Sequence, residues 1–306
     1  MLNKLRKFFK NQRNIDDIKI QNGMNFFSNM QLNLNNIKLI EHTYFKVFSQ
    51  NGEDGIIQYL LKSLKVENPK FVEIGTEDYS ESNTRYLYET KHGNGLIIDG
   101  CKNLEKKIQG FLPLYKGNLK IYNDLISSDS IIKILNQFNF LNNLDLFSID
   151  IDGIDYWVMK KLPDKISKIF VAEYNPYFGS NLEITVPNIK NFARGKYHYS
   201  NLCYGSSLMA IINLLKKKGF TFVGVNDLKN NAFFIQDDYI DLISLDLPIT
   251  SKLEAYTNAN YREGRNKDNT PNYLDPKNVL KKISDCCVVD LKDNSEKLIR
   301  QLKIIP

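Results

Sequence analysis

Short apolar runs alternate with segments of helical periodicity through the middle of the chain. Strand-length apolar runs occupy residues 70–76, 95–100, 119–125, 144–152 and 167–175. Apolar residues recur at three- and four-residue steps between and around them, at 55–65, 82–91, 103–111, 129–138 and 155–162. This alternation is typical of βαβ units and predicts a parallel sheet with helices on its faces.

The pattern changes after the fifth predicted strand. Residues 206–219 form a strong helix candidate, with Ser206 or Ser207 as N-cap and Gly219 as the stop signal. Two strand-like runs, 220–226 and 231–236, follow it and are joined by a short polar turn, which predicts a hairpin. We therefore expect an α/β fold in which a doubly wound, mostly parallel sheet has an antiparallel last strand.

The chain divides into three parts by pattern. Residues 1–43 form a polar, Asn-rich and basic extension, residues 44–240 hold the alternating elements, and residues 241–306 are less regular. The length of 306 residues suffices for a substantial core without disulfide or metal staples. We expect the last part to pack on or cap the same domain.

The distribution of charge along the chain bears on its expected partners. The net charge is +6, but the first thirteen residues contain five basic residues and no acid, so the remaining chain carries only +1. A nucleic-acid-binding domain would carry a basic face in its folded part, which argues against such partners. Leu2, Leu5, Phe8 and Phe9 are at helical spacing, so residues 1–13 are either a peripheral contact for an anionic inner membrane surface or a solvated extension.

The four cysteines indicate the redox environment in which the protein is expected to fold. Cys101, Cys203, Cys286 and Cys287 form no CxxC pair and have no histidines at zinc-binding spacing. No disulfide framework or structural zinc site is indicated. A cytoplasmic protein in a reducing environment is the expectation.

Acids and amides follow each predicted parallel strand. The strand ends read Glu73-Ile74-Gly75, Asp99-Gly100, Asn123-Asp124, Asp150-Ile151-Asp152 and Glu173-Tyr174-Asn175. One such residue is ordinary, because it can cap the next helix. Since ligands of doubly wound sheets bind beyond the carboxyl ends of the strands, five together predict a binding site there.

The first strand-to-helix loop helps to choose the ligand. "EIGTEDYSESNTR" lacks the GxGxxG pattern, and Glu77, Asp78 and Glu81 would repel a dinucleotide pyrophosphate. S-adenosylmethionine carries a sulfonium and an ammonium group and no phosphate. The loop therefore favours S-adenosylmethionine over NAD, with Asp99 at the ribose-binding position of such folds.

Five stretches carry a family resemblance: "FSQNGEDGIIQYLL", "FVEIGTEDYSESNTRYLYE", "SIDIDGIDYWVMKKL", "VAEYNPYFG" and "YGSSLMAIINLLKKKGF". Over roughly residues 44–236 the chain resembles the bacterial FkbM-related S-adenosylmethionine-dependent methyltransferases. The resemblance implies this cofactor and a class I methyltransferase fold. It also assigns Glu73 and Gly75 to the loop beside the methionine part of the cofactor and Asp99 to the adenosine ribose. Gln50, Asn51, Glu53 and Asp54 form a polar motif that we expect to fold against the same pocket, and Asp150 is a further predicted cofactor-binding residue. "GTEDY" departs from the usual glycine-rich loop.

The stretch 144–157, "LDLFSIDIDGIDYW", sets three aspartates at the end of a buried strand. Neighbouring strands lie about 5 Å apart, so Asp150, Asp152, Glu173 and Asn175 should converge. Together they resemble the divalent-metal site of metal-dependent O-methyltransferases and suit Mg²⁺ or Mn²⁺. An EF-hand is excluded by its spacing rule, because Gly153 stands fourth and Lys161 twelfth.

Two other interpretations of this cluster stay open. Asp152 or Glu173 could act as a general base without a metal. Alternatively, Asp152-Gly153 is a turn and Asp155 a helix cap. His198 is a further candidate base in a Tyr-rich loop, and Arg262 and Arg265 either hold an anionic substrate or form surface ion pairs.

The leading hypothesis is an O-methyltransferase, metal-assisted or not, that acts on a hydroxyl of a bacterial sugar or surface glycoconjugate. A small-molecule or glycan acceptor is thus the expected partner. The alternative is a catalytically silent binding protein of methyltransferase fold, supported by the atypical first loop. A metal-dependent hydrolase that uses the carboxylates alone is the third hypothesis.

Overall fold

The computed structural model describes residues 2–91, 93–259 and 261–302. Its main sheet has seven strands in the order β3-β2-β1-β4-β5-β8-β7. The first five are parallel to one another, and β8 is antiparallel to both of its neighbours. Their bounds are β1 Lys70–Ile74, β2 Asn94–Ile98, β3 Asn118–Tyr122, β4 Leu144–Ile149, β5 Ser167–Glu173, β7 Phe220–Val225 and β8 Asn231–Gln236.

The fold class predicted from the sequence is confirmed. The sheet is mostly parallel, and its last strand in chain order, β8, is the antiparallel one. This is the arrangement of a class I methyltransferase sheet. Ser207 is the N-cap of the predicted helix after β5, since its hydroxyl accepts from the backbone N–H of Ala210.

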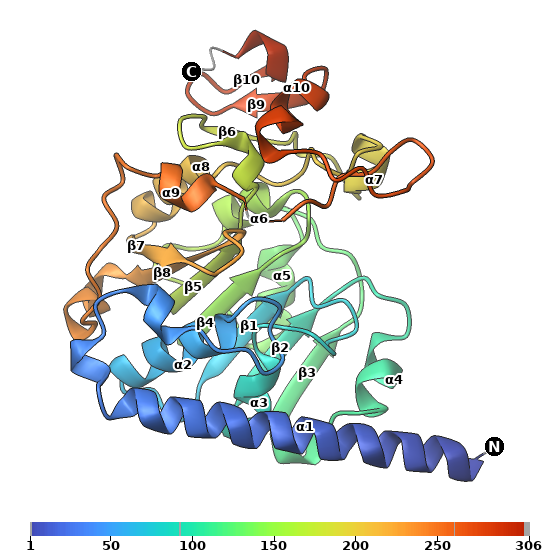
Figure 1. The fold of residues 1–306 in the computed structure, drawn as a ribbon, viewed down its shortest axis with the longest axis vertical. Coiled ribbons are helices and arrows are strands. Elements are labelled where there is room, and N and C mark those ends of the chain that lie inside the picture. The colour runs from blue at the N-terminus through green and yellow to red at the C-terminus, as the bar shows by residue number, and fades with distance from the viewer. Residues whose placement is uncertain (1, 92, 260, 303–306) are drawn as a thin grey trace.

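Helices cover both faces of the sheet (Figure 1). Every side chain of β4 is buried, as expected for a central strand packed on both sides. One apolar cluster joins α5, α6 and α8 to one face, and a second joins α2, α3 and α4 to the other. These helices are α2 Glu53–Ser63, α3 Arg85–Lys91, α4 Leu104–Gln109, α5 Ile131–Phe138, α6 Asp155–Lys161 and α8 Leu208–Lys217.

The polar N-terminal part contains a long helix that the sequence pattern did not reveal. Helix α1 spans Leu2–Gln31 and runs along one end of the molecule (Figure 1). Its Phe27 lies in an apolar cluster with Phe45 and Tyr86, and its buried Asp16 pairs with Arg85 of α3. The side chains of residues 2–10, which carry the membrane expectation, lie outside the described part of the structure.

A second, smaller sheet forms from distant segments. It has three strands in the order β10-β9-β6, with bounds β6 Ile184–Thr185, β9 Cys287–Asp290 and β10 Ser295–Leu298. It has its own apolar cluster and lies at the end of the molecule opposite α1 (Figure 1). The short helices α7 Arg194–Tyr197, α9 Glu254–Thr257 and α10 Val279–Lys282 belong to the same C-terminal and loop regions. We call the segments 176–206 and 254–302 the cap.

Within the described ranges, none of the helices combines the length and the apolar character needed to cross a bilayer.

Candidate functional site

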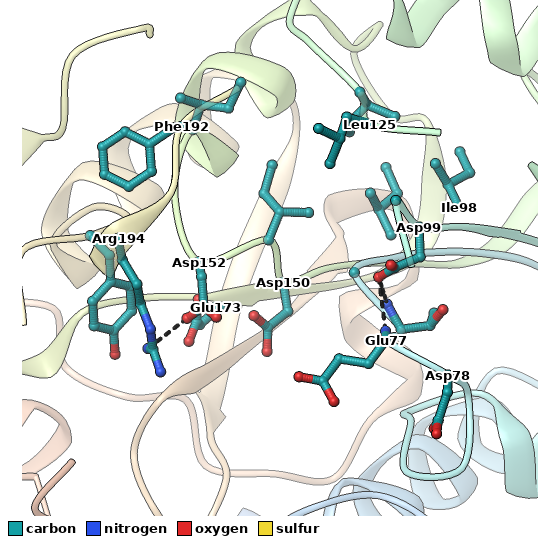
Figure 2. A pocket seen from close by; sticks show the side chains of 18 of the residues that line it. Glu77, Asp78, Ile98, Asp99, Leu125, Asp150, Asp152, Glu173, Phe192 and Arg194 are labelled. Carbon is teal, nitrogen blue, oxygen red and sulfur yellow. Dashed lines mark hydrogen bonds and ion pairs between the residues drawn. The ribbon is translucent and has the colours of Figure 1, made fainter. Parts of the chain in front are cut away.

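A cavity of about 450 Å³ opens beyond the carboxyl ends of the parallel strands. It lies where the strand order reverses between β1 and β4, which is the usual ligand position in a doubly wound sheet. The loops after β1, β2 and β3 line one half, which we call the cofactor half. The ends of β4 and β5 and the cap line the other, which we call the acceptor half (Figure 2).

The turn after β4 is shaped by Asp155. Its two carboxylate oxygens accept hydrogen bonds from the backbone N–H groups of Ile151 and Gly153, at 2.9 and 3.0 Å. Between these residues Asp152 adopts a positive φ of 53°, a conformation that aspartate tolerates better than most residues. Asp155 is fully buried and does not line the cavity. Asp155, which one interpretation made a helix cap, is instead the first residue of α6, and its side chain holds the turn that precedes the helix.

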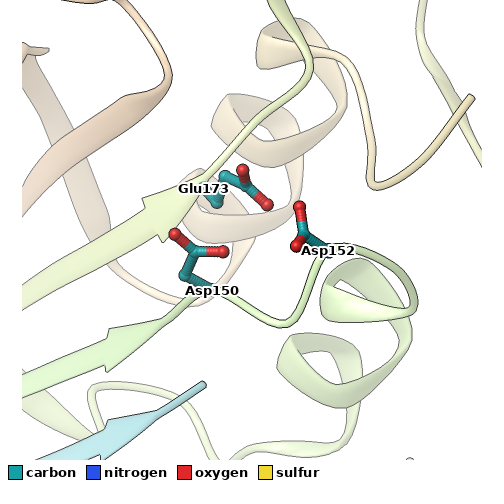
Figure 3. Close-up of side chains that lie close together, drawn as sticks. All are labelled: Asp150, Asp152 and Glu173. Carbon is teal, nitrogen blue, oxygen red and sulfur yellow. The ribbon is translucent and has the colours of Figure 1, made fainter. Parts of the chain in front are cut away.

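Asp150, Asp152 and Glu173 converge at the ends of β4 and β5 (Figure 3). One carboxylate oxygen from each lies within 4.8 Å of the others. Glu173 is only 5% exposed, and its Oε2 atom has no hydrogen-bond partner in the described part of the chain. Three oxygen donors at this spacing could hold a hard divalent cation or share a proton.

The pKa values of these acids reflect their crowding. Burial, followed by repulsion from Asp152 and Asp155, raises the pKa of Asp150 well above its usual range. Burial, followed by repulsion from the Asp150 and Asp152 carboxylates, also raises the pKa of Glu173 well above its usual range. The cluster is therefore costly for the protein when all three acids are charged and no cation is near.

Arg194 of the cap faces this cluster. Its Nη1 donates to Asp152 Oδ1 at 2.7 Å, and its Nη2 lies 3.3 Å from Glu263 Oε2. The guanidinium also lies 5.0 Å from the ring centroid of Tyr204. One arginine thus connects the end of β4 with two separate cap segments.

The cofactor half contains the acid that follows β2. Asp99 Oδ2 accepts from the backbone N–H groups of Thr76 and Glu77, both at 2.8 Å, and Oδ1 accepts from that of Cys101 at 2.6 Å (Figure 2). A carboxylate has about four acceptor positions, so one remains for a ligand hydroxyl. The Asp99 side chain therefore both holds the first loop and lines the cavity.

Three of the predicted cofactor-binding residues do not line the cavity. Glu73 accepts from the backbone N–H groups of Asn83 and Thr84 and so holds the start of α3. Glu53, fully buried, accepts from the side chains of Asn226 and Asn231 and from the backbone N–H of Asn51. Glu53, Glu73 and Asn51 thus lie outside the cavity lining, and their contact with a cofactor stays a prediction. Gln50, Gly75, Asp99 and Asp150 do line the cavity.

Two other predicted residues are used elsewhere. The Asn175 amide donates to the carbonyls of Leu202 and Tyr204, and its oxygen accepts from the Tyr177 N–H, so it shapes the cap rather than joining the three carboxylates. His198 also lies outside the cavity lining, with its Nδ1 2.6 Å from the Ser200 hydroxyl. Neither geometry fits the predicted role of metal ligand or base.

The two arginines proposed for an anionic substrate are also elsewhere. Arg262 and Arg265 make long contacts of 3.5 Å with backbone carbonyls of their own loop and do not line the cavity. The residue between them, Glu263, does. The cavity lining therefore takes Glu263, and neither of the two arginines, from this stretch.

Several lining residues were not identified from the sequence. In the cap these are Phe192, Arg194, Tyr204, Tyr261 and Glu263. No spacing pattern connects them, because they come from three separate loops. Only the clustering of aromatic residues around "KYHYSNLCY" pointed to this region.

The solved structures to which this chain is similar include methyltransferases. No family model and no curated protein matches the sequence. An O-methyltransferase family protein from Burkholderia thailandensis is 9% identical over 60% of this chain and 57% of its own, with a TM-score of 0.35. Human N-acetylserotonin methyltransferase, solved in complex with S-adenosylmethionine, is 10% identical over 60% of this chain and 55% of its own, with a TM-score of 0.31.

The chain spans a little more than half the length of these two proteins. At such identities and TM-scores the likeness carries no argument about activity. Function must be inferred from the residues of the cavity itself.

Proposed function

We propose that this protein is an S-adenosylmethionine-dependent O-methyltransferase that acts on a hydroxyl group of a bacterial sugar or surface glycoconjugate. The observation that carries the proposal is one continuous cavity with two different ends. Its cofactor half follows the first three strands, and its acceptor half holds the three converging carboxylates.

The residues of the cofactor half fit S-adenosylmethionine. Asp99 keeps one free acceptor position for a ribose hydroxyl, and the buried Thr76 hydroxyl has no partner among the described residues. Ile98, Leu125 and Ile126 supply apolar surface for a planar base. When bound, S-adenosylmethionine supplies an electrophilic methyl group, and the acidic lining favours its sulfonium and ammonium charges.

The carboxylates of the acceptor half would surround the reacting hydroxyl. In the transfer, the oxygen–carbon bond forms as the sulfur–carbon bond breaks, and the hydroxyl proton must go to an acceptor. Glu173 is suited to this, because its buried Oε2 has no other partner in the described chain. The carboxylate of Asp152 is held in a fixed position beside it by the hydrogen bond from Arg194.

The three carboxylates also fit a divalent cation such as Mg²⁺ or Mn²⁺. Asp150, Asp152 and Glu173 would hold it, without Asn175, whose amide is already bonded. When bound, the cation supplies positive charge beside the oxygen that becomes negative. Such a cation would offset the mutual repulsion of the three acids.

The test measures binding and transfer separately. Calorimetry should detect S-adenosylmethionine binding, and labelled methyl transfer should be measured on a panel of sugars and glycolipids with Mg²⁺ or with EDTA. We expect Asp152→Asn and Glu173→Gln to lower turnover at least tenfold with little change in cofactor affinity, whereas Glu254→Gln, exposed on α9, should have no effect.

Each result has a defined meaning. Full activity in EDTA would exclude the cation and leave Glu173 as the direct base. Full activity in both site variants would mean that these carboxylates are structural. Absence of S-adenosylmethionine binding would favour the silent binding protein.

We also propose that residues 1–13 make a peripheral contact with an anionic membrane surface. Their five basic residues and absence of acids support this, as does the helical backbone of α1 from Leu2 onward. The full chain should bind anionic vesicles at low salt, and a chain without residues 1–13 should not. Equal binding of the two would contradict the proposal.

A further inference from the structure

Two buried carboxylate oxygens in the acceptor half have no hydrogen-bond partner within the described residues. They are Oε2 of Glu173 and Oε1 of Glu263, and both residues line the cavity. Glu173 comes from the end of β5, whereas Glu263 comes from the cap. Because a buried acceptor without a donor is costly, the ligand of this half should bring donors to both.

The charges of the acceptor half are unbalanced. Asp150, Asp152, Glu173 and Glu263 line it, and Arg194 is the one basic residue in the described cavity lining. Its guanidinium is already paired with Asp152 and Glu263. The lining of this half therefore has four acidic side chains and one basic side chain.

The walls of this half are aromatic. Phe192, Tyr204 and Tyr261 line it, and the hydroxyls of the two tyrosines lie 3.4 Å apart. Aromatic faces beside carboxylates favour ammonium groups and disfavour phosphates or carboxylates. The acceptor half therefore favours ligands with a positive charge.

We infer that the acceptor carries a protonated amino group near the hydroxyl that is methylated, and that Glu263 accepts a hydrogen bond from this group while Glu173 faces the hydroxyl. This inference rests on the proposed function and gives its substrate class: an amino sugar, rather than a sugar phosphate or a sugar acid. Glu263 is then a specificity-determining residue, held in place by Arg194.

The experiment uses three matched probes, glucosamine, N-acetylglucosamine and glucosamine 6-phosphate. Their affinities for the full chain saturated with S-adenosylhomocysteine are measured by calorimetry or ligand-observed NMR, with Mg²⁺ and with EDTA. We expect glucosamine to bind at least tenfold more tightly than the other two. In Glu263→Gln this preference over N-acetylglucosamine should fall to less than threefold, and in Glu254→Gln it should persist.

A second variant guards against a merely structural effect of Glu263. Arg262→Gln changes a charge at an exposed position of the same cap loop that does not line the cavity, so it should keep the preference for glucosamine. Equal affinity for glucosamine and N-acetylglucosamine, or no binding of glucosamine, would overturn the inference. So would a preference that Glu263→Gln leaves intact.

The two proposals can fail separately. If neutral sugars are methylated as well as amino sugars, the methyltransferase proposal stands and the inference of a protonated amino group on the acceptor is contradicted. If glucosamine binds through Glu263 and no methyl transfer occurs with any probe, the amine site stands and the activity is wrong.

Discussion

The carbonyl oxygen of Asp150 occupies the space where a side chain on Gly75 would have to lie. A Cβ atom at position 75 would come within 1.5 Å of that oxygen, and Gly75 has a φ of +82°. The first loop and the end of β4 therefore meet backbone to backbone at the strand-order reversal. The glycine that the family resemblance assigned to the cofactor also has this structural role.

Gly75→Ala should be strongly destabilising. It adds a steric clash to the cost of a positive φ, and we expect a loss of more than ~2 kcal/mol in the free energy of unfolding. Gly205→Ala is the matched control, because Gly205 has a φ of +61° and a Cβ atom added there would meet nothing within 4 Å. Equal losses in urea unfolding of the two variants would contradict the steric explanation.

Asp155→Asn should disturb the turn that carries Asp152. Asparagine has one acceptor oxygen, so its amide group would face one of the two N–H donors of Ile151 and Gly153. We expect a loss of about 1–3 kcal/mol in unfolding free energy. Asp129→Asn, at an exposed position with a side chain 86% accessible, should lie within ~0.5 kcal/mol of the parent. An Asp155→Asn value in that same range would show that the turn does not need the carboxylate.

The docking of α1 should depend on Asp16 far more than on its neighbour. Asp16 and Arg85 are both almost fully buried, and Arg85 also contacts Glu89. Removing one member of a buried ion network costs about 3–5 kcal/mol, so Asp16→Ala should strongly increase hydrogen exchange along α1. Asp17→Ala, whose side chain is half exposed beside Arg13, should change it little. Similar exchange in the two variants would argue against a buried anchor.

Stability should depend on pH through Glu73. Burial raises the pKa of this carboxyl from 4.5 to about 7. The folded protein therefore holds the proton more tightly than the unfolded chain, and the stabilisation it gives below pH 4.5 is lost as the pH rises through 7. Glu73→Gln cannot titrate.

The measurement for Glu73 is urea unfolding of both proteins at about pH 5 and about pH 7.5, on either side of the raised pKa. We expect the parent to lose on the order of 2 kcal/mol relative to Glu73→Gln between these values. A constant difference between the two proteins would mean that Glu73 has an ordinary pKa.

Local pattern was enough to predict the main sheet. Side-chain periodicity predicts both the strands and the helices between them. This periodicity can be recognised within a few consecutive residues, so it needs no knowledge of long-range contacts. The approach of Asp150, Asp152 and Glu173 could also be expected, because the ends of adjacent parallel strands must meet at one edge. The same reasoning did not show that Glu53, Glu73 and Asn175 lie outside the cavity lining, since position in the sequence does not show which hydrogen-bond partners a carboxylate or amide will meet.

Tertiary structure alone decided the acceptor half. Arg194 and Tyr204 come from one cap segment and Glu263 from the other, and no periodicity connects them because their contacts depend on how the cap folds over the strand ends. The docking of α1 has the same cause, since its polar sequence gains order from Arg85 and the apolar cluster around Phe27. The sequence by itself determined at which edge of the sheet the cavity lies, through local periodicity, and long-range packing determined which side chains line it.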